Sequence, residues 1–142
     1  IKEKDLDKLL SLPFKKKEIF KETPYKYSVR VAYQTPVSIA YEGNDEEAIA
    51  STFEDCLVYT NYQLFKTIAT DDTGSLIKSV SDGINIADSF ETFHKGVYDT
   101  LRNGKSEFAL DLIYAVDPNE LIVPAYIDEG LKWLQAYLDP EE

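Results

Sequence analysis

The chain has 142 residues, of which 44% are hydrophobic, and its 26 acidic and 15 basic residues give a net charge of −11. This length suits one domain, and so high an apolar fraction excludes a disordered acidic tail. The negative charge argues against binding of nucleic acid through phosphate contacts and against attraction to an anionic membrane surface. We therefore expect no nucleic acid and no membrane as partner.

The N-terminal sequence is charged and lacks the apolar core of a signal peptide. Cys56 is the only cysteine and cannot close an internal disulfide, which is typical of a reducing compartment. We expect a cytoplasmic protein.

The charge is unevenly distributed along the chain. Residues 1–30 hold nine basic and five acidic residues, a net of +4, whereas residues 31–142 hold six basic and 21 acidic residues, a net of −15. We expect one helical domain over 1–142, in which a basic N-terminal arm, 1–23, precedes an acidic helical body, 24–142. Charges of one sign repel one another at this density, which favours a basic partner.

The first half of the chain is expected to be helical. Leucines at helical spacing predict a helix over 3–11. Residues 25–42 fit two patterns: an alternation typical of a strand over 27–33, and an apolar helical face that we favour. Asn44 is expected to cap a long helix that ends near 71–74, since three acidic residues follow it where the helix dipole favours negative charge.

The second half shows apolar residues at three- and four-residue steps throughout. They predict helices over about 75–102, from Ser106 to about 117, and over about 124–138 with Pro124 in the first turn. Gly43 and Gly104 each follow an apolar stretch and precede a Glu and an Ala at the same spacing, which predicts repeated helical hairpins. The predicted fold class is all-α, with stacked antiparallel helical hairpins and a short β segment left open near 25–33.

Catalytic patterns are sparse. His94 is the only histidine, and it and Cys56 lie on apolar helical faces where packing is the usual role. No zinc-ligand spacing and no phosphate-binding glycine loop is present, and residues 71–74 lack the closing Glu of a calcium loop. We expect no enzyme activity, no metal and no cofactor.

The ten tyrosines and the acidic side chains point to a protein partner instead. Tyrosine is a common interface anchor, and complementary charge accelerates association. A basic protein partner would meet an acidic set, with the oligomeric state left open: Glu42, Asp45, Glu46, Glu54, Asp55, Asp71 and Asp72.

Three stretches carry a resemblance to a known group of proteins: residues 40–48, 93–107 and 130–136. In them the chain resembles the immunity protein 49 group of bacterial toxin systems. The resemblance implies a stoichiometric inhibitor that neutralises a cognate toxin, often a nuclease with a basic cleft. The alternative is a phage- or mobile-element-encoded helical adaptor or assembly protein, or an inhibitor that mimics DNA charge.

Overall fold

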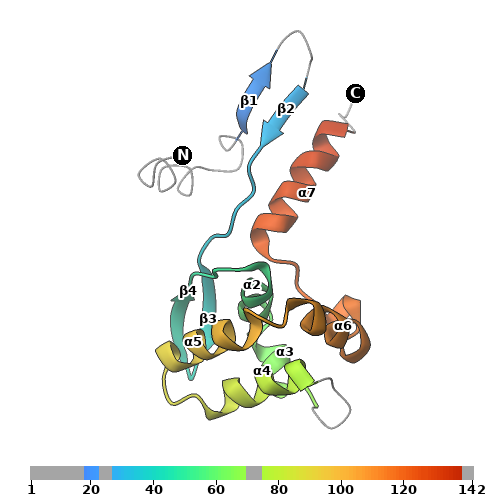
Figure 1. Ribbon diagram of the computed structural model, residues 1–142. Helices are drawn as coiled ribbons and strands as arrows, with labels where there is room; N and C mark the ends of the chain where they lie inside the picture. Colours follow the sequence, from blue (N-terminus) through green and yellow to red (C-terminus); the bar gives the residue numbers. More distant parts are fainter. Residues whose placement is uncertain (1–17, 23–26, 70–74, 139–142) are drawn as a thin grey trace. The chain divides into compact units, whose positions relative to one another are not determined.

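The computed structural model describes residues 18–22, 27–69 and 75–138. The chain divides into two compact units: unit 1 comprises Ile1–Thr35 and Ala125–Glu142, and unit 2 comprises Pro36–Pro124 (Figure 1). We describe each unit by itself. The helix expected over 3–11 lies outside the described residues, and the prediction of one domain over 1–142 stays a prediction.

Unit 1 contains a β-hairpin and a helix. Strand β1 (Glu18–Glu22) pairs antiparallel with β2 (Tyr27–Arg30), with an irregularity between Glu18 and Phe20. The strand at 27–30 confirms the β segment left open near 25–33, and β1 was not expected. Helix α7 (Ala125–Leu138) agrees with the predicted C-terminal helix, and it starts one residue after Pro124.

In unit 2, β3 (Val37–Tyr41) and β4 (Asn44–Ala48) form a second antiparallel hairpin. The helix favoured over 25–42 is therefore wrong, and so is the helix start predicted at Asn44. The chain reverses at Glu42 and Gly43, which have φ angles of 47° and 85°. Positive φ at both central residues is the conformation of a type I′ turn, which suits the twist of a hairpin and ends any helix. Tyr41 is buried and its neighbours are exposed, the period of two of a strand.

The long helix predicted from Asn44 begins only at Phe53 and is divided at Asn61. Helix α2 (Phe53–Thr60) is capped by Thr52, whose hydroxyl accepts a hydrogen bond from the amide of Asp55. Helix α3 (Tyr62–Thr67) follows directly, and Asn61 flanks both helices.

The stretch over 75–102 also forms two helices rather than one, α4 (Ser75–Ile86) and α5 (Phe90–Leu101), and Ser89 caps the second. Helix α6 (Lys105–Ala115) begins after Gly104 and not at Ser106, and the 3₁₀ turn η2 (Pro118–Glu120) follows it. Gly104 thus lies between two helices as predicted, but Gly43 lies in a β-turn, so the predicted repeat of helical hairpins is not reproduced there.

The described residues are mostly helical, with six α-helices, and the two β-hairpins correct the all-α class. Aromatic rings fill the centre of unit 2, where Phe93 lies 5.4–5.8 Å from the rings of Tyr41, Tyr59, Tyr62 and Phe90. Cys56 is buried beside this cluster on α2, as its apolar neighbours predicted. In the described ranges, we find no helix whose length and apolar character would carry it across a membrane.

Candidate functional site

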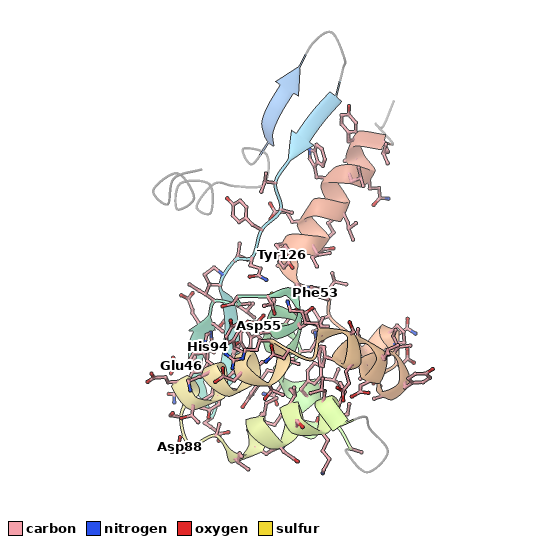
Figure 2. All side chains as sticks on the ribbon, in the orientation of Figure 1. Glu46, Phe53, Asp55, Asp88, His94 and Tyr126 are labelled. Atoms are coloured by element: carbon pink, nitrogen blue, oxygen red, sulfur yellow. The ribbon has the colours of Figure 1, made fainter. Side chains whose placement is uncertain are left out.

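The acidic residues predicted to bind a partner fall into three places. Glu42, Asp45 and Glu46 lie on the β3–β4 hairpin. Glu54 and Asp55 lie in the first turn of α2, and Figure 2 labels Glu46 and Asp55. Asp71 and Asp72 lie outside the described residues. The predicted set is therefore divided between a hairpin and a helix start in unit 2.

Glu42, at the turn of the hairpin, is paired within its own unit. Its carboxylate lies 2.6 Å from Nζ of Lys66, which also lies 3.4 Å from the hydroxyl of Tyr62 and 5.6 Å from the centre of the Tyr62 ring. The hydrogen bond to Glu42 raises the pKa of Lys66, with a smaller opposing effect of burial. Because the Glu42 side chain is 63% exposed, solvent weakens this pair, but it keeps the turn beside α3.

Asp55 is a structural carboxylate. It is 1% exposed and accepts hydrogen bonds from the amides of Ser51 and Thr52 at 2.8 and 2.6 Å and from the Thr52 hydroxyl. Together with the Thr52 hydroxyl it forms a reciprocal capping box, which satisfies amides that a helix start would leave unpaired. A buried carboxylate with these partners holds the helix and has no surface to offer a partner protein.

Glu54 is paired with Lys105 at the start of α6. The Lys105 ammonium lies 3.1 Å from Oε2 of Glu54, a buried oxygen for which the described residues offer no regular hydrogen bond. Burial acts to raise the pKa of Glu54, but its own backbone amide, Lys105 and Thr52 outweigh burial, and the pKa is lowered. The pair joins α2 to α6 across 51 positions of sequence. Glu54 therefore stabilises the fold.

The remaining carboxylates lie on the open face of the hairpin. Asp45 and Glu47 are exposed, Glu46 is half-buried, and neither Asp45 nor Glu47 has an ion-pair partner in the part of the chain described. Sequence reasoning missed Glu47, because the run 45–47 was assigned to a helix. A strand reading would have placed positions 45 and 47 on one face.

The cations of residues 31–69 and 75–138, in contrast, are all paired. Each Lys or Arg between residues 31–69 and 75–138 has a carboxylate within 4 Å: Lys66, Lys78, Lys95, Arg102, Lys105 and Lys132. The excess of negative charge in this part of the chain is therefore left at residues such as Asp45 and Glu47. The site that the geometry offers is an acidic strand pair suited to cations.

Cys56 and His94 have separate contacts. Burial raises the pKa of the Cys56 thiol, with a smaller opposing effect of Thr60. The His94 ring stacks on Tyr59 with centroids 5.2 Å apart, and its Nε2 lies 3.1 Å from the carbonyl oxygen of Ile49. No hydrogen bond joins the two residues in the described chain, and within the same ranges no group of three or more His, Cys, Asp or Glu side chains could hold a metal ion.

Comparison with known proteins gives one similarity. The chain is 31% identical over 110 residues to the endonuclease GajA of Bacillus cereus (strain HuB5-5), a match that covers 73% of this chain and 16% of that protein. The chain thus spans less than a fifth of the length of its curated relative. No family model matches the chain, and no solved structure matches it significantly.

Proposed function

We propose that this chain is a segment of a nucleic-acid-cleaving protein related to endonuclease GajA, in which it serves as a folded support for a catalytic centre formed mainly elsewhere. The similarity over 110 residues carries this proposal. Because the match covers only 16% of the relative, the residues that contact phosphates need not belong to this segment.

The charges of the segment fit a supporting role. Nucleic-acid contacts use Lys and Arg side chains that can neutralise phosphates. Over residues 31–69 and 75–138, those cations are already paired with carboxylates of the same unit, as in Lys105–Glu54 and Lys66–Glu42. A segment whose cations stabilise its own fold depends on the rest of the protein for phosphate contacts.

An exposed apolar surface on α6 supports the same role. Leu110, Ile113 and Tyr114 follow one another at helical spacing and are 57%, 72% and 88% exposed. Contiguous apolar side chains on a surface usually mark contact with more protein. This surface would face the remainder of the nuclease-like protein.

A chimera tests the proposal. In GajA, the stretch that matches this chain would be replaced by the corresponding residues of this chain, and cleavage of the relative's own nucleic-acid substrate would be measured. We expect the chimera to cleave, and the chimera with Asp55→Ala, which removes an acceptor of the α2 cap, to be less stable and to cleave less. A chimera with Glu91→Gln, an exposed change of the same unit, is the matched control. A chimera that folds like the relative and does not cleave would overturn the proposal.

The exposed carboxylates Asp45 and Glu47 favour a second candidate, an immunity or inhibitor protein that neutralises a basic toxin. In this role, the chain itself would be the complete binding agent and would need no catalytic group. Pull-down from cells with the double variant Asp45→Asn, Glu47→Gln as control tests it. We expect a basic toxin that binds the unaltered chain and is released by salt, and capture of no basic protein would overturn this candidate.

A further inference from the structure

Strand β3 has one edge that the hairpin leaves open. In a hairpin closed by a two-residue turn, the pair flanking the turn is hydrogen-bonded, and the pairs alternate from there. The pairing Tyr41↔Asn44 and Ile39↔Glu46 therefore uses the backbone groups that point toward β4. The amides and carbonyls of Ser38 and Ala40 point to the opposite edge, and the described residues offer them no hydrogen bond.

A groove runs along this open edge. Figure 1 shows β3 between β4 and α2, and β3 contacts both elements. The groove has a volume of about 220 Å³, and β3 residues 38–40 form one wall. The α2–α3 junction, residues 59–64, forms the other wall, and Glu120 and Ile122 lie along it. A free strand edge beside a groove is the arrangement in which a second polypeptide adds a strand.

The two faces of an added strand would meet different surroundings. On the outer face of the hairpin, the small side chains of Ser38 and Ala40 lie opposite Glu47 and Asp45 on β4. Two strand spacings, about 9.6 Å, would separate an added strand from β4. Lys or Arg side chains can cross the small residues over that distance and reach the carboxylates, whereas Asp or Glu would be repelled.

The inner face of the groove is mostly apolar and aromatic. Tyr59 and Tyr62 are buried there, and Leu64 and Ile122 contribute apolar surface. Side chains of an added strand that point inward would be apolar, and those that point outward would be cationic.

We propose that the open edge of β3 binds an extended segment of another protein in which Lys or Arg alternates with apolar residues. The backbone of Ser38 and Ala40 supplies the pairing, Asp45 and Glu47 select the cationic side chains, and the groove takes the apolar ones. This interaction surface lies within unit 2 and does not rest on the nuclease proposal, because the chain alone would bind the segment.

The probe is a fluorescein-labelled peptide, Lys-Val-Lys-Val-Lys-Val, whose binding to the 142-residue chain is measured by fluorescence anisotropy. We expect Ala40→Pro, which removes an edge amide without touching the β3–β4 ladder, to weaken binding about tenfold, since proline cannot donate to a new strand. Ala40→Ser keeps both the amide and a small side chain, and it should bind within about twofold of the unaltered chain. A Glu-Val peptide, and a Lys-Val peptide methylated on every backbone nitrogen so that it has no amide to donate, should both fail to bind.

Two further measurements separate strand addition from simple charge attraction. The Asp45→Asn, Glu47→Gln variant should bind several-fold more weakly, whereas Asp82→Asn, Glu91→Gln removes the same charge elsewhere in unit 2 and should change little. Bound peptide should also slow hydrogen exchange of the Ser38 and Ala40 amides, a readout that holds even where Ala40→Pro disturbs the hairpin. Equal binding of the N-methylated Lys-Val peptide, or unchanged exchange at both amides with the Lys-Val peptide bound, overturns the proposal.

Discussion

Asn61 and Ile122 exchange two hydrogen bonds although 61 positions of sequence separate them. Nδ2 of Asn61 donates to the carbonyl of Ile122 at 2.9 Å, and the amide of Ile122 donates to Oδ1 of Asn61 at 2.7 Å. Nδ2 also donates to the carbonyl of Leu57 at 2.9 Å. One buried side chain thus ends α2 and fixes the extended segment that follows η2.

We predict that Asn61→Ala lowers the free energy of unfolding by about 2 kcal/mol, because it removes the partners of the part-buried amide and carbonyl of Ile122. The carbonyl of Leu57 keeps its hydrogen bond from the backbone amide of residue 61. Urea unfolding followed by far-ultraviolet circular dichroism measures the change. Asn85→Ala is the matched control: its amide bonds the carbonyls of Ser81 and Lys66 from an exposed position, so the loss should stay below about 1 kcal/mol. Equal losses in the two variants would contradict the importance of the Ile122 contact.

The capping box of α2 gives a graded prediction. Thr52→Ala should destabilise the protein by about 1 kcal/mol, the usual loss of an N-cap, and Thr52→Ser should change little because its hydroxyl remains. Asp55→Ala should have the largest effect, about 2–3 kcal/mol, since it removes a buried carboxylate that accepts from the part-buried amides of Ser51 and Thr52. Thermal unfolding of the three variants checks the order, and an Asp55→Ala protein as stable as Thr52→Ser would refute it.

Two glycines should respond to alanine in opposite directions. A side chain at Gly96, inside α5, would meet nothing within 4 Å, so Gly96→Ala should stabilise the protein by about 0.5–1 kcal/mol through helix propensity. Gly43→Ala also meets open space, but the φ of 85° is strained for alanine, and a loss of about 1 kcal/mol is expected. Melting temperatures that move in the same direction would count against the turn geometry.

The Glu54–Lys105 pair predicts a pH dependence. The pKa of Glu54 is lowered in the folded protein, so its ionised form stabilises the fold above the ordinary pKa of 4.5, and this contribution is lost as the pH falls through the lowered value. At neutral pH, Glu54→Gln should lower the free energy of unfolding by about 1 kcal/mol, and the difference should shrink in acid.

At neutral pH, Lys105→Met should lose most of the stability that Glu54→Gln loses. Lys95→Met breaks an exposed pair with Asp99 and should change the free energy of unfolding by only about 0.3 kcal/mol. Urea titrations at several pH values measure these differences. A Glu54→Gln effect that does not change between neutral and acidic pH would show that its ionisation is not the cause.

The helices of the second half were predictable because their apolar periodicity is strong, and α7 agrees with the prediction to within about a residue. The β3–β4 hairpin was not, because Asp and Glu are poor strand residues and the run 45–47 also suits a helix start. Pairing with Val37–Tyr41 makes this run a strand rather than a helix start. Local propensity could not predict this outcome, because it does not show which segment a strand pairs with.

The division between α2 and α3 at Asn61 could not be predicted from local sequence either. No proline or glycine marks it, and the residue that holds it, Ile122, is distant in sequence. Of the candidate site, the acidic character was predictable from composition, but the separation of exposed Asp45 from buried Asp55 depends on the fold. The similarity to an endonuclease had no counterpart in any motif of the chain.

The labelling rate of Cys56 can report how often the protein opens. It is the sole thiol of the chain, it is 1% exposed, and it lies on α2. A water-soluble thiol reagent reaches it only when α2 moves away from its neighbours, so the labelling rate reports how often unit 2 opens. Variants of the α2 cap, of Asn61 and of the Glu54 pair can then be compared under native conditions, without denaturant and without an engineered cysteine.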